Sequence, residues 1–302
     1  MNATTAYTYT AADVNTAFNK ISATLFAGKT AEAIPRMLIT AGLQASGKTY
    51  LLEKSLLTSG RYDNYVRLYI PEYREEHPQY SQMVELGKLH AYEHTEAFVR
   101  AVCAKIFEEA FRRKLNIILE CAFDSIDFAA LPMAAATKGY QLEIHIVACS
   151  HAFAFLSNVK RGLRSLEKSE LERFVRSSDL KTSLNNSHAV IFQLESAAKA
   201  VEGSQIFLYE RGLGALKDRA MRGHSTCTRN AKGTLELTAT GQGYDYATYQ
   251  SIASNTINSF AERDEMIKEC HLALQKTAQY ADQVPAFVYN ALHSRIIKYA
   301  NR

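Results

Sequence analysis

Residues 42–49 of the chain read Gly-Leu-Gln-Ala-Ser-Gly-Lys-Thr, which satisfies the pattern G-x-x-x-x-G-K-[ST]. The two glycines allow a tight turn in which successive backbone N–H groups point inward, a geometry that holds a polyphosphate. In this pattern Lys48 reaches the β- and γ-phosphates, and the Thr49 hydroxyl ligates the Mg²⁺ that bridges them. The expected nucleotide-binding residues are therefore Gly42, Ala45, Ser46, Gly47, Lys48 and Thr49.

The segments around this motif supply the context that it requires. A short apolar run of strand length precedes it at residues 37–40, and a helical pattern follows it at residues 50–57 and ends near Gly60. Helical spacing is also found at residues 13–26, where Asp13 is the expected N-cap, and at 79–114, whereas strands are expected at 65–70, 115–120, 141–148 and, as the last strand of the sheet, 205–209. This alternation predicts an α/β fold with a mainly parallel sheet covered on both faces.

Composition and charge are those of a globular protein. The chain has 302 residues, of which 47% are hydrophobic and 22% charged, and this excludes collagen-like and wholly disordered classes. Because the net charge of +4 is spread along the chain, we expect no nucleic-acid partner. Five cysteines without a C-x-x-C pair argue against a disulfide framework and a zinc site, and they favour a reducing cytoplasm.

No targeting or membrane-spanning segment is expected. The first eighteen residues lack the basic and apolar regions of a standard export signal, and no apolar run reaches the length of a bilayer span. We therefore expect no membrane partner and a cytoplasmic location, although delivery by a specialised secretion system leaves no trace of this kind in a sequence.

A shift in composition divides the chain into a domain at 1–215 and an appendage at 216–302. Residues 226–245 are rich in turn-forming residues and predict a β-hairpin. Residues 246–280 and 286–300 then read as two helices separated by Pro285. We expect this appendage to be a packing extension of the domain, with regulation in cis as the alternative.

Charged residues directly after predicted strands are the first candidates for chemistry beyond nucleotide binding. Open α/β sheets bind their ligands beyond the C-terminal ends of the strands. That rule selects Glu72 and Arg74 after the second strand and Glu120 after the third, with solvated loop charges as the alternative. Residues 160–176 read as an exposed helix-loop-helix that is either a lid over the phosphates or merely a solvated helix; its arginines are Arg161, Arg164, Arg173 and Arg176.

Several of these segments together resemble the zeta toxin family of P-loop kinases from bacterial toxin–antitoxin modules. The resemblance runs from the first helix to about Leu213, and its pieces occur in family order. They are Ala27-Gly28-Lys29 at a helix end, the P-loop, the block Tyr73-Arg74-Glu75-Glu76-His77-Pro78-Gln79-Tyr80, a strand ending in Glu120, the break Lys138-Gly139-Tyr140, and Lys160-Arg161 followed by Arg173. The block at 73–80 is far more specific than the P-loop, which a large superfamily shares.

The resemblance implies a P-loop kinase-like three-layer fold and an activity. Family members transfer the γ-phosphate of ATP or GTP to the 3′-hydroxyl of the sugar in UDP-N-acetylglucosamine, use Mg²⁺, and are held inactive by a small helical antitoxin. By position, Lys48 and Thr49 match the phosphate and Mg²⁺ residues, and Arg161 and Arg173 match the lid arginines. The residues expected on the sugar-nucleotide side are Arg74, His77 and Glu120.

Three departures from the family pattern leave alternatives open. Pro71 occupies the position of the family's proposed catalytic aspartate, so Glu72 beside it is the expected base. Cys121 and Ala122 follow Glu120 where Gly-Thr is usual, and Ala104 replaces a helical glutamate. The alternatives to a zeta-like kinase are a nucleotide-binding pseudo-kinase with a partner-binding role and a kinase for another small acceptor, such as an antibiotic or a nicotinamide dinucleotide.

Overall fold

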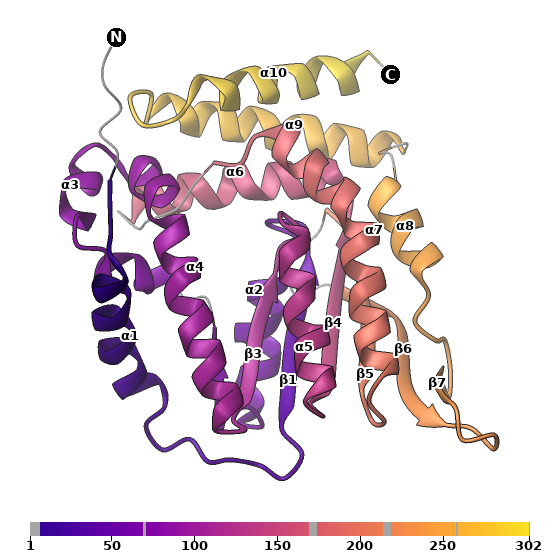
Figure 1. Ribbon diagram of the computed structural model, residues 1–302. Helices are drawn as coiled ribbons and strands as arrows, with labels where there is room; N and C mark the ends of the chain where they lie inside the picture. The colour runs from indigo at the N-terminus through magenta and orange to yellow at the C-terminus, as the bar shows by residue number, and fades with distance from the viewer. Residues whose placement is uncertain are drawn as a thin grey trace.

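A single mixed β-sheet organises the chain. The computed structural model describes residues 7–68, 71–168, 174–213, 219–255, 257 and 259–301. In these residues the sheet has seven strands in the order β2-β3-β1-β4-β5-β6-β7 (Figure 1). The strands are β1 Arg36–Gly42, β2 Tyr65–Arg67, β3 Asn116–Cys121, β4 Gln141–Cys149, β5 Gln205–Arg211, β6 Arg219–Arg229 and β7 Leu235–Thr238.

The central position of β1 follows from its sequence. Six of its seven residues are buried, because an apolar run without alternation suits a strand that is covered on both faces. It pairs in parallel with β3 on one side and with β4 on the other, so that Gly42, Cys121 and Val147 come to the same edge of the sheet. The end of β1, where the P-loop begins, is therefore flanked by the ends of two other strands.

Helices cover both faces of the sheet, as the α/β prediction requires. Their bounds are α1 Ala11–Leu25, α2 Lys48–Leu51, α3 Tyr80–Glu85, α4 Lys88–Arg112, α5 Ala130–Thr137, α6 His151–Glu167, α7 Ser177–Lys199, α8 Tyr246–Ser254, α9 Phe260–Ala278 and α10 Ala286–Ala300. The large core cluster joins one face of the sheet to α1, α4, α5, α7 and α8. A smaller cluster around Leu38, Leu52 and Tyr62 covers the other face.

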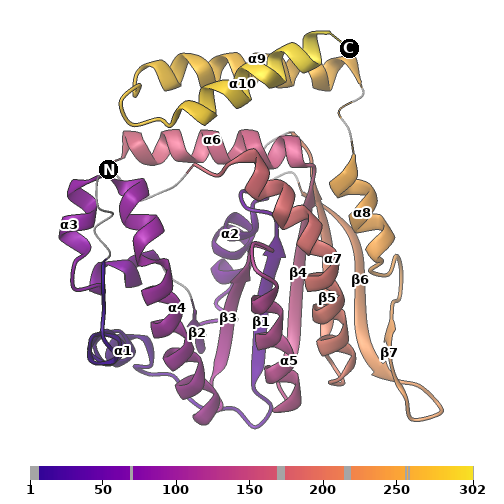
Figure 2. The same cartoon turned by 45° about the horizontal axis from the view of Figure 1, so that its top comes forward.

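Helix α6 crosses the end of the sheet beneath a hairpin of α9 and α10 (Figure 2). A second apolar cluster, separate from the sheet core, holds these three helices together. Lys160 pairs with Glu269, and Lys276 Nζ lies 2.5 Å from Glu167 Oε1. The expectation that residues 160–176 are exposed is therefore wrong in part, because the chain's own C-terminal helices cover the apolar side of α6.

Four further expectations need correction. Thr10 rather than Asp13 is the N-cap of α1, and the two side chains form a capping box in which Asp13 is the N3 residue. The helix expected at 79–114 is divided into α3 and α4 at Gly87, and that expected at 246–280 is divided into α8 and α9. Strand β5 is not the last strand, because β6 pairs with it antiparallel and β7 pairs with β6.

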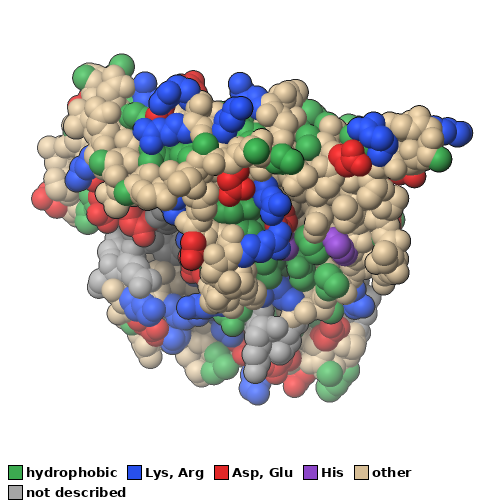
Figure 3. All heavy atoms as spheres, turned by 90° about the horizontal axis from the view of Figure 1, so that it is seen from below, with side chains coloured by type: hydrophobic (Ala, Val, Ile, Leu, Met, Phe, Trp, Pro, Cys, Tyr) green, Lys and Arg blue, Asp and Glu red, His purple; other side chains and the backbone are tan. Residues whose placement is uncertain are grey.

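The hairpin predicted within residues 226–245 is present as the turn between β6 and β7. It extends the central sheet, so a division at 215/216 would separate two hydrogen-bonded neighbours, β5 and β6. On the face of the molecule drawn in Figure 3, basic and acidic side chains are interspersed rather than gathered into one basic field. No helix in the described part of the chain is long and apolar enough to cross a bilayer.

Candidate functional site

The P-loop turns tightly between β1 and α2, and its two glycines are required for different reasons. A Cβ atom at Gly42 would lie 2.6 Å from the carbonyl oxygen of Val147 and 2.7 Å from Ser46 Oγ, far inside normal contact distance. Gly47 has φ 94°, in the left-handed region that favours glycine. From there the chain continues through α2, a π-helical turn (η1, Leu52–Leu56) and a 3-10 turn (η2, Leu57–Ser59). The motif thus connects a strand to a helical segment as its sequence predicts.

Lys48 is a buried ammonium group at the mouth of this loop. Its Nζ donates a long hydrogen bond of 3.4 Å to the carbonyl oxygen of Leu43. Burial lowers the pKa of Lys48, whereas the charges of Glu120 and Asp124 act in the opposite direction and that of Arg161 lowers it further. A desolvated cation that makes only one, weak hydrogen bond to the described residues is suited to an anionic ligand, which would restore the interactions that burial removes.

Thr49 and Glu120 form the oxygen-rich side of the site. The Thr49 hydroxyl donates to Glu120 Oε2 at 2.6 Å, and Arg67 holds Glu120 Oε1 at 2.7 Å. Mg²⁺ takes oxygen ligands and is usually held by one or two carboxylates together with substrate phosphates. Within the described residues no cluster of three or more His, Cys, Asp or Glu side chains has metal-binding geometry, so this hydroxyl–carboxylate pair fits Mg²⁺ only in combination with a phosphate ligand.

A cleft of about 840 Å³ opens from the P-loop. One wall is formed by residues of the P-loop and α2, a second by α6, and a third by α9. Arg161 and Arg164 from α6 line it together with Lys48 and Thr49. The structure therefore brings the first predicted lid arginine onto the same cleft as the predicted phosphate-binding residues. Arg173, the second, lies outside the described residues.

Two further arginines, which the sequence analysis does not single out, brace the P-loop from β5 and β6. Arg211 Nη1 donates to the carbonyl oxygen of Ala45 at 2.5 Å, and its Nη2 donates to Ser157 on α6 at 2.7 Å. Arg219 Nη2 donates to the carbonyl oxygen of Gly47 at 3.0 Å. Burial lowers the pKa of both arginines, and the charge of Arg211 lowers that of Arg219 further. Because these residues are opposite each other in the β5–β6 pair, the antiparallel strand β6 contributes directly to the site.

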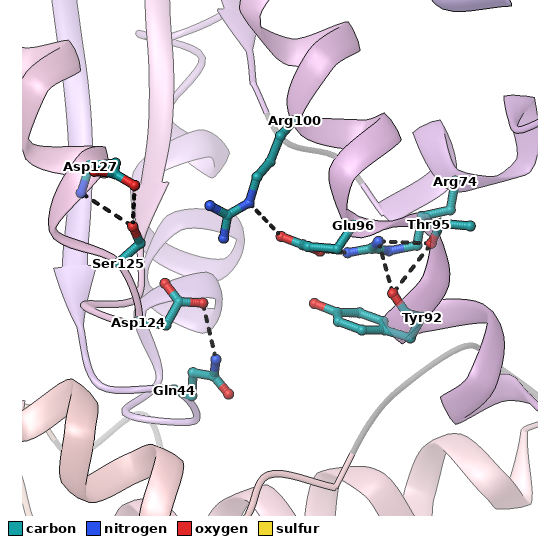
Figure 4. A network of polar contacts seen from close by, with 9 residues as sticks. All are labelled: Gln44, Arg74, Tyr92, Thr95, Glu96, Arg100, Asp124, Ser125 and Asp127. Carbon is teal, nitrogen blue, oxygen red and sulfur yellow. Dashed lines mark hydrogen bonds and ion pairs between the residues drawn. The ribbon is translucent and has the colours of Figure 1, made fainter. Parts of the chain in front are cut away.

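Asp124 is another polar residue that the sequence analysis misses. It follows β3, and its Oδ2 accepts a hydrogen bond of 3.4 Å from Gln44 of the P-loop. Figure 4 shows Asp124 and Gln44 facing the same space as Tyr92, Glu96 and Arg100 of α4. The available signal in the sequence was a carboxylate four residues after the predicted strand-end Glu120. The sequence does not show that the turn after β3 directs the Asp124 side chain toward Gln44 of the P-loop.

The remaining predicted residues lie away from the cleft. Glu72 is exposed in the 3-10 turn Pro71–Glu76. Arg74 is only 1% exposed, and its guanidinium lies 3.8 Å from the centre of the Tyr92 ring and 2.7 Å from Glu96 Oε2. His77 is buried against Tyr9 and Phe98. Arg74 and His77 thus hold the 73–80 block against its neighbours, whereas Glu120 faces Thr49.

A phosphate-binding loop at the end of a central parallel strand, facing a helix that carries arginines, defines a P-loop protein with a kinase-like fold. Within that class, the profile of the Zeta toxin family matches residues 22–227, and the chain belongs to this family. The match covers the sheet from β1 to most of β6, including the whole P-loop and both bracing arginines.

Solved structures share the fold at low sequence identity. A chain from the PezAT chromosomal toxin–antitoxin system of Streptococcus pneumoniae is 16% identical, with a TM-score of 0.59 over 90% of this chain and 98% of the other. A chain of the AvrRxo1-ORF1:-ORF2 complex with ATP is 12% identical, with a TM-score of 0.53 over 94% of this chain and 86% of the other. The native AvrRxo1-ORF1:-ORF2 complex gives 11% identity and a TM-score of 0.51 over 94% and 83%. No curated protein is a significant match.

Proposed function

We propose that this protein is a kinase that transfers the γ-phosphoryl group of ATP or GTP to a hydroxyl group of a small molecule. The observation that carries the proposal is the alignment of Lys48 and the Thr49–Glu120 pair at a P-loop that opens into a large cleft. Membership of the zeta toxin family supports it, because the family's members are kinases. One of the similar solved structures is a complex with ATP, which supports a nucleotide donor.

On the donor side, the proposed chemistry is mainly electrostatic. Lys48 would hold the β- and γ-phosphates, and Arg161 would approach the transferring group from α6, with Arg173 as a further candidate. Thr49 and Glu120 would hold Mg²⁺, which when bound spreads the negative charge that develops on the phosphate oxygens. Arg211 and Arg219 would fix the main chain of the loop so that its amides are already oriented before the nucleotide arrives.

On the acceptor side, a carboxylate has to orient or deprotonate the attacking hydroxyl. Glu72 is the residue expected from the sequence, but it is exposed and is not among the charges that act most strongly on Lys48. Asp124 is among them and faces the space between the P-loop and α4 (Figure 4). We therefore propose Asp124 as a second candidate for the base, alongside Glu72.

For the acceptor itself we propose UDP-N-acetylglucosamine, at its sugar 3′-hydroxyl, or a related nucleotide conjugate. This rests on the family resemblance of the 73–80 block and on the space bordered by polar residues of α4, with Arg74 and His77 supporting the block from beneath. A small helical antitoxin is the proposed protein partner, since one of the similar structures comes from a toxin–antitoxin system. The proposed site of action is the bacterial cytoplasm.

A second candidate function is a nucleotide-binding pseudo-kinase that acts through a partner. The observation in its favour is that Pro71 occupies the position of the family's catalytic aspartate while Glu72 beside it is exposed to solvent. This candidate predicts nucleotide binding without transfer. It also predicts that the biological effect is lost in Lys48→Ala but unchanged in both Glu72→Gln and Asp124→Asn.

Transfer of radiolabel from γ-labelled ATP or GTP to a panel of UDP-sugars and dinucleotides tests the kinase directly. We expect labelled product with Mg²⁺, none from Lys48→Ala, and a loss of at least about 10²-fold in the variant that removes the true base. A control variant, Glu85→Gln, changes a carboxylate at the exposed end of α3 and should leave transfer unchanged. Binding of ATP without any labelled product, over the whole panel, would select the pseudo-kinase.

A further inference from the structure

The cleft that begins at the P-loop ends against the C-terminal hairpin. Residues of α9 and its C-cap line it opposite the P-loop and α6; they are Glu269, Leu272, Ala273, Gln275, Lys276 and Gln279. Leu272, Gln275 and Gln279 follow one another at spacings of three and four residues, so they lie on one side of the helix. The segment expected to be an appendage therefore forms one wall of the proposed nucleotide site.

The chemistry of this wall differs from that of the P-loop. Near the loop, the cleft presents main-chain groups and the cations Lys48 and Arg161, which suit phosphates. At α9 it presents the amides of Gln275 and Gln279 beside Leu272, a residue that is 49% exposed. Both glutamines are exposed, so their amides are accessible to a ligand in the cleft. An apolar surface beside accessible amides suits a flat ring with donors and acceptors at its edge, which is the chemistry of a nucleobase.

Helix α9 is also held firmly enough to act as a fixed wall. The ion pairs Lys160–Glu269 and Glu167–Lys276 join it to α6 at two points along its length. Its opposite side, with Met266 and Cys270, is buried in the apolar cluster that α6 and α10 share. The position of α9 relative to the arginines of α6 is thus set before a ligand binds, which reduces the ordering cost of binding.

We propose that α9 forms the base-recognition wall of the donor nucleotide site, with Gln275 and Gln279 bonding the edge of the base and Leu272 packing on its face. The proposal deepens the proposed kinase function and rests on it. The triphosphate occupies the P-loop, the ribose lies beside α6, and the base contacts residues 272–279. The C-terminal hairpin is then part of the nucleotide site, in addition to packing on α6.

Calorimetry with two magnesium-loaded ligands tests this proposal. ATP occupies both ends of the cleft, whereas inorganic tripolyphosphate occupies the P-loop alone. For the double variant Gln275→Ala/Gln279→Ala, we expect the Kd for ATP to rise about tenfold, because two neutral hydrogen bonds are removed, and the Kd for tripolyphosphate to change less than about twofold. A matched control, Gln193→Ala/Gln250→Ala, removes two exposed amides from α7 and α8 and should change neither Kd.

The outcomes separate this inference from the kinase proposal. If the wild-type protein binds neither ligand, the nucleotide site itself is refuted. If the wild type binds both and the α9 double variant binds ATP with unchanged affinity, the base-recognition wall is refuted and the P-loop stands. An equal rise in the Kd of ATP and of tripolyphosphate in the α9 double variant also refutes the base-recognition wall. Such a result would mean that the substitutions disturb the structure of the P-loop, since tripolyphosphate has no base.

Discussion

Replacement of Gly42 by alanine tests the geometry of the P-loop most directly. The added Cβ would lie 2.6 Å from the carbonyl oxygen of Val147 in β4 and 2.7 Å from the buried Ser46 Oγ. The Ser46 side chain can rotate away from the added Cβ. The carbonyl group of Val147 belongs to a central strand that is hydrogen-bonded on both sides, so its displacement would cost free energy. Overpacking of this kind costs about 1–3 kcal/mol. The strand and the loop must separate by several tenths of an ångström, which also moves the amides that face the phosphate.

Urea unfolding and calorimetry with Mg-ATP measure the two consequences of Gly42→Ala separately. We expect a loss of about 1–3 kcal/mol in the free energy of unfolding and a loss of ATP affinity of at least about tenfold. Gly241→Ala is a matched control, because Gly241 has no heavy atom within 4 Å of the added Cβ and no left-handed φ. If Gly42→Ala is as stable as the control and binds ATP as tightly as wild type, the described packing of the P-loop against β4 is refuted.

Three other outcomes follow from the site and its surroundings. Arg219→Met removes the hydrogen bond to the carbonyl oxygen of Gly47. The Kd for Mg-ATP, measured by calorimetry, should therefore rise about tenfold. An unchanged Kd would mean that this arginine does not support the loop. Removal of Mg²⁺ with a chelator should abolish label transfer, and added Mg²⁺ should restore it; transfer that persists in the chelator contradicts the proposed Thr49–Glu120 site. Hydrogen bonds from Arg112 and Arg113 lower the pKa of Glu109 to about 2, so its stabilising effect is complete above about pH 4.5 and is lost as the pH falls toward 2. In thermal unfolding, the wild type should accordingly have a higher melting temperature than Glu109→Gln at neutral pH, and this difference should disappear near pH 2. A difference that stays constant at all pH values contradicts the pairing of Glu109 with the two arginines.

The parts of the fold that local patterns specify were predictable. Strands β1 and β3 contain near-continuous apolar runs, and Gly42 and Gly47 have the spacing that a phosphate-binding turn needs. Strand, loop and helix could therefore be predicted together. The hairpin of β6 and β7 was also predictable, because turn-forming residues lie between two β-like runs.

The parts that depend on contacts between distant segments were not predictable. Arg211 reaches Ala45 across 166 positions and Arg219 reaches Gly47 across 172, and no local pattern reports such a pairing. The burial of α6 depends likewise on α9, which follows much later in the chain. The rule that ligands bind beyond strand ends selected Arg74 as a candidate site residue, but its guanidinium packs on the ring of Tyr92. The sequence does not show this, because a guanidinium in a short 3-10 turn can stack inward as readily as it can face solvent.

The order of the strands has a consequence for synthesis on the ribosome. Strand β1 emerges early, yet its two neighbours end at Cys121 and Cys149, and the last wall of the cleft ends only at Gln279. A partly translated chain therefore exposes residues 42–49 without the surfaces that make a pocket of them. Only when the segment that ends at Gln279 has left the exit tunnel does a complete cleft exist, so products terminated before that point carry the P-loop but lack the finished site.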